Sequence, residues 1–179
     1  MSTNYNTTSA IHLQDEIRKL GPAILGLELG VWYGVNMGHI LEECPNVRLL
    51  YGVDPYLPYQ DWNRFIDQGM MDAAYGSARA IADNFGSRAD ILKMNSQEAA
   101  DRFHGSQLDF IFIDGDHSFE RCYEDLNLWY EHVRPGGLFS GHDFSLPGVN
   151  KALLQFRTER KIKGFFKVIP NDVWYWIKD

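Results

Sequence analysis

Two clusters of ionisable side chains in the second half of the chain have the composition of a reactive site. The clusters consist of Asp114, Asp116, His117, His142 and Asp143. Carboxylates and imidazoles can together bind a divalent metal ion, and an imidazole can also exchange a proton near neutral pH. Turn formation and helix capping are the alternative explanation for the aspartates, which are common after strands. Because the pattern occurs twice, we favour the chemical interpretation.

Each cluster directly follows a short apolar segment that predicts a β-strand. The two segments are Leu108–Ile113 and Gly137–Ser140. The helix predicted between them has an apolar face formed by Phe119, Cys122, Leu126, Tyr130 and Val133. Ser118 can cap its start, and the proline-glycine-glycine run at 135–137 ends it. A strand–helix–strand crossover makes the strands parallel, so both clusters should meet at the carboxyl edge of the sheet, where α/β proteins bind ligands.

Strands and helices alternate along the rest of the sequence as well. Further strands are expected at Ala23–Leu29, Val47–Val53, Ile91–Met94, Phe165–Ile169 and Val173–Ile177. The last two flank a Pro-Asn-Asp turn, which predicts an antiparallel hairpin. The expected fold is therefore α/β, with a doubly wound, Rossmann-like, seven-stranded sheet that is mostly parallel and ends in a C-terminal antiparallel hairpin.

Length and composition fit one domain over residues 1–179, since 45% hydrophobic and 23% charged residues are ordinary globular values. Residues 1–9 are rich in Asn, Thr and Ser and are expected to be flexible. The net charge of −7 and the lack of a basic run argue against a nucleic-acid partner. A homo-oligomer is left open.

Membrane and redox features point to the cytoplasm. No segment of the sequence reaches transmembrane length, and none reads as a secretory signal, so we expect no membrane partner. Cys44 and Cys122 fall on apolar helix faces and are expected to be buried thiols in a reducing compartment.

A second candidate site lies where the first predicted strand turns into a helix. Gly30 and Gly34 allow a tight turn and a close ligand approach, and Glu28 could accept a hydrogen bond from a ligand ammonium group. Asp54 ends the next strand at the spacing where an acid holds ribose hydroxyls. The glycines could instead form only a turn, and Asp54-Pro55 is a common turn pair. The Gly-x-x-x-Gly spacing disfavours NAD and FAD, whose pyrophosphate uses a fuller glycine set.

These pieces together resemble the class I S-adenosylmethionine-dependent methyltransferases. The matching stretches are Leu27–Gly34, Leu49–Tyr56, Lys93–Ala100, Leu108–Glu120 and Arg134–Phe144. The last two look most like a small O-methyltransferase group that includes macrocin O-methyltransferases and cephalosporin-hydroxylase-like proteins. The resemblance implies an enzyme that moves a methyl group from S-adenosylmethionine to a hydroxyl of a small-molecule or sugar acceptor.

The resemblance also implies a role for each matching residue. The implied cofactor contacts are Glu28, Gly30 and Gly34 for methionine, Asp54 for ribose, Asn95 and Ser96 for adenine, and Asp114 beside them. Capping of a helix is the alternative role for Ser96. In metal-dependent relatives an acid and a polar pair bind a divalent ion such as Mg²⁺ or Mn²⁺, which implies Asp114, His142 and Asp143 here. Relatives commonly have two acids, or an acid and an amide, in the pair.

Methyl transfer requires the acceptor proton to be removed. The candidate catalytic residues are Asp114 through a metal, or His117 or His142 as a general base. A solvent-exposed position at a helix start is the alternative for His117. The aromatic segment Tyr56–Phe65 could cover the site as a lid, or simply pack against the next helix.

Two other functional classes fit a similar fold. One is a nucleotide-dependent oxidoreductase or sugar-modifying enzyme, which a comparison of S-adenosylmethionine with NAD binding would separate. The other is a cofactor-binding protein without transfer activity. The presence of Glu28, Asp54, Asp114 and Asp143 argues against such a degenerate site.

Overall fold

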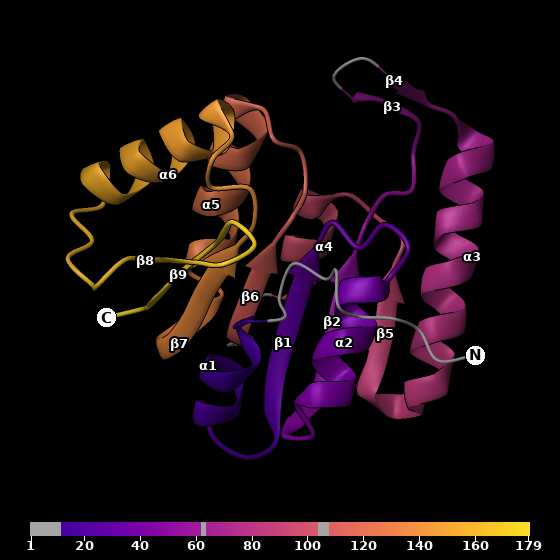
Figure 1. Ribbon diagram of the computed structural model, residues 1–179, viewed down its shortest axis with the longest axis horizontal. Helices are drawn as coiled ribbons and strands as arrows, with labels where there is room; N and C mark the ends of the chain where they lie inside the picture. The colour runs from indigo at the N-terminus through magenta and orange to yellow at the C-terminus, as the bar shows by residue number, and fades with distance from the viewer. Residues whose placement is uncertain (1–11, 62–63, 104–107) are drawn as a thin grey trace.

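The chain folds into alternating helices and strands, as its patterning predicts (Figure 1). The computed structural model describes residues 12–61, 64–103 and 108–179, so the expected flexible segment 1–9 lies outside the described residues. The helices are α1 Gln14–Lys19, α2 Val35–Glu43, α3 Gln68–Phe85, the short 3₁₀ helix Gly86–Arg88, α4 Ser96–Arg102, α5 Phe119–Tyr130 and α6 Pro147–Glu159. The strands are β1 Ile24–Leu29, β2 Val47–Val53, β3 Tyr59–Asp61, β4 Arg64–Ile66, β5 Ala89–Leu92, β6 Leu108–Ile113, β7 Val133–Gly141, β8 Lys167–Ile169 and β9 Val173–Ile177.

Seven strands form one sheet in the order β5-β2-β1-β6-β7-β9-β8. The first five in this order pair in parallel, and β9 runs antiparallel to both of its neighbours. The predicted fold is therefore confirmed, including the antiparallel hairpin at the C-terminal end. In the parallel part, the carboxyl ends of the strands share one edge, which positions the candidate site residues.

Two apolar cores lie on opposite faces of the sheet. One packs residues from α1, α2 and α3, such as Ile17, Met37 and Ala74, against one face. The other packs α4, α5 and α6, through residues such as Leu126 and Phe156, against the other face. Both cysteines are buried and free, as expected. Among the described residues, no helix combines the length and apolar character needed to cross a membrane.

Several predicted boundaries differ from the observed ones, and the strand expected at Phe165–Ile169 begins only at Lys167. The strand expected at Ile91–Met94 begins at Ala89, where it pairs with β2. The helix expected to reach Val133 and stop at 135–137 ends at Tyr130, and β7 already begins at Val133. The register between β6 and β7 shifts between Leu108 and Phe110, so the proline-glycine-glycine run lies in an irregular part of the strand. Proline and glycine are tolerated at such irregularities.

The segment after β2 contains a hairpin that the sequence pattern did not predict. Strands β3 and β4 pair antiparallel, with Tyr59 opposite Ile66. The hairpin projects beyond the main sheet near the start of α3 (Figure 1). Each strand has three residues, which is too short for a period of two to be recognised.

Candidate active site

The predicted site residues meet at the carboxyl edge of the sheet. Parallel pairing of β1 with β2 and β6, and of β6 with β7, brings the ends of these four strands together. Glu28 and Asp54 come from the ends of β1 and β2, whereas Asp114 and Asp143 follow β6 and β7. The edge therefore has two halves, one built on β1 and β2 and the other on β6 and β7.

The β6–β7 half contains a cluster of two imidazoles and two carboxylates. His117 Nε2 lies 2.7 Å from Asp143 Oδ2. The same carboxylate oxygen lies 3.1 Å from His142 Nδ1, which is also 3.4 Å from Asp114 Oδ1. One carboxylate oxygen thus bridges two imidazoles, and the structure brings together four of the five residues in the two predicted clusters, all except Asp116.

Hydrogen bonding sets the charge of this cluster. Burial would lower the pKa of His142, but hydrogen bonds with Asp114 and Asp143 raise it to about 10. A hydrogen bond with Asp143 also raises the pKa of His117. Burial opposes ionisation of Asp143, yet the two histidines hold the pKa of its carboxyl well below the usual range. Positive charge on imidazole therefore compensates the paired carboxylates.

The loop that presents Asp143 is strained and tied down by the terminal hairpin. Asp143 has a φ of 58°, which is uncommon for a residue other than glycine. The Trp174 indole donates a hydrogen bond of 2.8 Å to the His142 carbonyl. The Asp172 carboxylate accepts hydrogen bonds from the backbone and hydroxyl of Ser145. Strain that is held in place in this way is typical of functional sites.

A divalent ion would fit this half of the edge. Asp114, His117 and Asp143 can each offer one ligand atom, and these atoms lie within 4.8 Å of one another. Two carboxylates with one imidazole suit Mn²⁺ or a similar transition metal. This group contains His117, whereas the resemblance implied His142 as the histidine ligand. His117 lies in the loop between β6 and α5, two residues before the helix begins, so its position depends on that loop.

Glu28 occupies an unusual position in the β1–β2 half. Its side chain is 1% exposed, and Asn36 Nδ2 donates a hydrogen bond of 3.0 Å to its Oε1. Its Oε2 is buried and, within the described residues, has no hydrogen-bond partner. Burial raises the pKa of Glu28 to about 8. An unsatisfied buried carboxylate oxygen fits the expected acceptor of a ligand ammonium group. The sequence analysis did not identify Asn36, although its place in the first turn of α2 is a usable signal.

Asp54 organises the glycine turn. It is 7% exposed, and its carboxylate accepts hydrogen bonds from the backbone nitrogens of Val31, Trp32 and Tyr56 at 3.1, 3.0 and 2.8 Å. Burial raises the pKa of Asp54, whereas these bonds favour its charged form. Oδ1 accepts only the Tyr56 bond among the described residues, so it keeps capacity for a ligand hydroxyl.

The two glycines are required by packing. Gly30 has a φ of 85°, and a Cβ placed there would lie 2.1 Å from the Asp114 carbonyl oxygen. Gly34 has a φ of 77°, and its Cβ would lie 2.8 Å from Ala78 Cα. A side chain at Gly30 would therefore collide with the backbone after β6 before it reached a ligand. Backbone packing is thus a second reason for glycine at these positions, besides the predicted close approach of a cofactor.

Three polar residues have structural partners that differ from those expected. Asn95, not Ser96, caps α4, in a capping box with Glu98. The Ser96 hydroxyl instead donates a hydrogen bond of 2.6 Å to Asp125 Oδ1. Ser118 is the N-cap residue of α5, as expected, but its side chain makes no capping bond. Its backbone nitrogen donates a hydrogen bond to the Asp116 carboxylate. Asp116 thus has the turn role that was its alternative.

Comparisons with known proteins identify the family. A family model described as a methyltransferase domain matches residues 27–144. The O-methyltransferase from Bacillus cereus in complex with SAH is 14% identical, with a TM-score of 0.65, and the match covers 93% of this chain and 79% of that one. A calicheamicin methyltransferase is also 14% identical, with a TM-score of 0.68 and coverage of 93% and 77%. Identities this low show similarity of fold.

One curated relative is closer in sequence but matches over a short stretch. An uncharacterized protein from Acanthamoeba polyphaga mimivirus is 32% identical over 76 residues. The match spans 36% of this chain and 34% of that protein. The family match from β1 to the loop after β7, on this sheet order, decides the assignment. The chain belongs to the methyltransferase-domain family, within the class I S-adenosylmethionine-dependent group that its sequence resembles.

Proposed function

We propose that the protein transfers a methyl group from S-adenosylmethionine to a hydroxyl of a small-molecule or sugar acceptor. The observation that supports this most directly is the juxtaposition of two different sites at one sheet edge. The buried, unsatisfied Glu28 carboxylate offers a place for an ammonium group. The cluster of Asp114, His117, His142 and Asp143 offers groups that handle a proton or a metal ion. O-methyltransferases among the structural neighbours favour oxygen as the methylated atom.

The residues of the β1–β2 half suit the cofactor. S-adenosylmethionine, when bound, supplies a methyl group on a positively charged sulfur. Glu28 Oε2 would accept a hydrogen bond from the ammonium of its methionine part, and Asp54 Oδ1 would accept one from a ribose hydroxyl. Asn95 and Ser96 stay candidates for the adenine side, where their capping and Asp125 contacts keep the loop after β5 in place.

The residues of the β6–β7 half suit the acceptor. His142, with a pKa of about 10, is protonated at neutral pH and balances the carboxylates. His117 Nε2 lies 2.7 Å from Asp143 Oδ2, and we assign His117 the role of general base. Asp143 accepts from its Nε2 and thereby leaves Nδ1 to take the acceptor proton.

The same half also suits a divalent ion held by Asp114, His117 and Asp143. A bound ion would lower the pKa of the acceptor hydroxyl. In that case His117 is a ligand, and the carboxylates align the hydroxyl with the methyl group.

The proposal is tested by titrating the full-length protein separately with S-adenosylmethionine and with NAD in a calorimeter. We expect one-to-one binding of S-adenosylmethionine and none of NAD. Transfer of a radiolabelled methyl group to a panel of phenols and glycosides then tests the reaction. Binding of NAD alone would replace the proposal with an oxidoreductase.

A further inference from the structure

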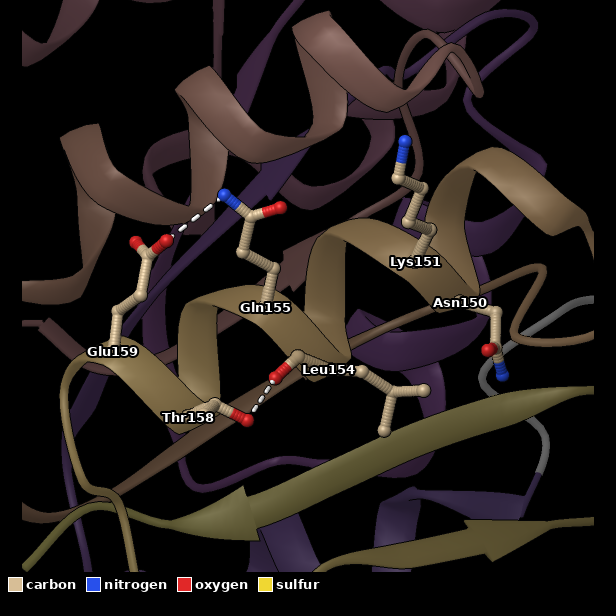
Figure 2. A pocket seen from close by; sticks show the side chains of 6 residues that line it. All are labelled: Asn150, Lys151, Leu154, Gln155, Thr158 and Glu159. Carbon is tan, nitrogen blue, oxygen red and sulfur yellow. Dashed lines mark hydrogen bonds between the residues drawn. The ribbon is translucent and has the colours of Figure 1, made fainter.

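The outer face of α6 carries two adjoining hollows. The first is lined by Asn150, Lys151, Leu154, Gln155, Thr158 and Glu159 (Figure 2). The second, here called the α6 hollow, is lined by Leu154, Arg157, Thr158, Lys161, Ile162 and Lys163. Leu154 and Thr158 belong to both. None of the candidate active-site residues lines either hollow, so this surface is separate from the carboxyl edge.

The two hollows differ in charge. In the first, Glu159 accepts hydrogen bonds from Gln155, at 2.9 Å, and from the Tyr123 hydroxyl. The residues that line the first hollow therefore include one acidic side chain, Glu159, and one basic side chain, Lys151 (Figure 2). The α6 hollow has three basic side chains among its lining residues, and no acidic one within the described chain.

The basic side chains of the α6 hollow differ from many others in forming no ion pair with a carboxylate within the described residues. Ion pairs with carboxylates engage many other basic side chains, namely Arg18, Lys19, Arg79, Arg121, Arg134, Arg160 and Lys178. In the part of the chain that the structure describes, Arg157, Lys161 and Lys163 form no such pair. In a protein of net charge −7, three basic side chains around one hollow form a local positive site, which the Asp179 carboxylate offsets in part at Arg157.

Arg157 is held rigidly at the wall of the hollow. Its guanidinium lies 5.0 Å from the ring centre of Phe166 and 4.8 Å from that of Trp176, and its Nη2 donates a hydrogen bond of 2.7 Å to the Gly164 carbonyl. Its Nη1 is buried and, within the described residues, has no hydrogen-bond partner. An unsatisfied charged donor is costly, and an anionic acceptor that reached it would remove this cost.

Protection of the sheet edge is the alternative explanation for the lysines. Lys161 and Lys163 precede the edge strand β8, and lysines near an edge strand discourage pairing with other chains. Edge protection needs exposed, mobile charges. It does not explain a guanidinium that packs against two aromatic rings and has an unsatisfied nitrogen.

We propose that the α6 hollow binds a phosphate group, carried by a free organic phosphate or by a lipid headgroup. A planar guanidinium and two flexible ammonium groups match the charge and acceptor oxygens of phosphate. Leu154 and Ile162 add apolar surface for the organic part. None of its lining residues belongs to the proposed cofactor or metal site, so this site is independent of the proposed function.

The experiment measures binding of inorganic pyrophosphate to the full-length protein by calorimetry. The variant Lys161→Glu/Lys163→Glu should bind about tenfold more weakly or more. The control Arg48→Glu/Arg102→Glu makes the same change in net charge at exposed positions outside the hollow and should bind like the wild type. Arg157→Gln, checked for folding by its thermal transition, should also bind about tenfold more weakly.

A second arm identifies the source of the phosphate group. The protein is sedimented with phosphatidylcholine vesicles that contain or lack phosphatidic acid. Binding to pyrophosphate but not to vesicles supports a free organic phosphate, and sedimentation with only the acidic vesicles, lost in Lys161→Glu/Lys163→Glu, supports a lipid headgroup. The proposal is overturned if the wild type binds neither probe. It is also overturned if Arg48→Glu/Arg102→Glu weakens binding as much as Lys161→Glu/Lys163→Glu does, or if Arg157→Gln binds like the wild type.

Discussion

The two halves of the catalytic edge hold their carboxylates in different ways. In the β1–β2 half, backbone amides bind Asp54 and a buried amide side chain binds Glu28. In the β6–β7 half, two imidazoles share Asp143. Backbone amides do not titrate, whereas imidazoles do. Under the proposed function, the first half would bind the cofactor, and the second would change its protonation or exchange protons for a metal ion.

The largest effect is expected for Gly30→Val, which would break both halves at once. Its Cβ would lie 2.1 Å from the Asp114 carbonyl oxygen, at a φ of 85°. We expect a loss of about 3 kcal/mol or more in the free energy of unfolding, measured by denaturant titration. Gly76→Ala is the control, because nothing lies within 4 Å of a Cβ at this position in α3. A Gly30→Val protein as stable as the wild type would show that Gly30 does not pack closely against the Asp114 backbone.

The next effect concerns the β1–β2 half alone. Asp54→Ala leaves three backbone N–H groups without their acceptor. We expect S-adenosylmethionine affinity to fall by about 1–3 kcal/mol, with a comparable loss of thermal stability. Unchanged calorimetric affinity in the folded variant would remove Asp54 from the cofactor site.

The contribution of the β6–β7 half to stability should depend on pH, which distinguishes it from the backbone contacts of the β1–β2 half. The pKa of His142 is raised to about 10 from an ordinary value of 6.5, so its stabilisation is fully present below about pH 6.5 and is lost as pH rises through 10. The pKa of Asp143 is depressed, so its share is present above about pH 4 and is lost in acid. In metal-free protein, His142→Gln should therefore cost about 2 kcal/mol near pH 6 and little above pH 10. A stability difference that does not vary with pH would contradict the assigned charges.

The smallest effect is expected from metal removal. After chelation, Mn²⁺ at about ten times its dissociation constant should raise the free energy of unfolding by about 1.4 kcal/mol. His117→Gln should abolish this gain, because His117 is in the ligand group. An equal response in both proteins would place the ion elsewhere, and no response in the wild type would favour His117 as the base.

Sequence patterns predicted the sheet and the residues at its edge because buried parallel strands leave long apolar runs with polar ends. They missed the hairpin β3–β4, whose strands are too short to show a period. They also missed Asn36, since its bond to Glu28 depends on how α2 packs on β1. The places of Asp54 at a strand end and of Gly30 in a turn could be predicted from the sequence. Their contacts with the backbone of other segments could not, because these contacts depend on the assembled sheet.

The central claim is that the β1–β2 half binds the cofactor and the β6–β7 half serves the acceptor. It is tested most directly by titrating S-adenosylhomocysteine into two matched variants. Both Glu28→Gln and Asp143→Asn replace one carboxylate with an amide, and pH 8.5 lies above the Glu28 pKa of about 8. At that pH, Glu28→Gln should bind between about tenfold and a hundredfold more weakly than the wild type. Asp143→Asn should bind within about threefold of it. Wild-type affinity in Glu28→Gln, or an equal loss in Asp143→Asn, would contradict the account.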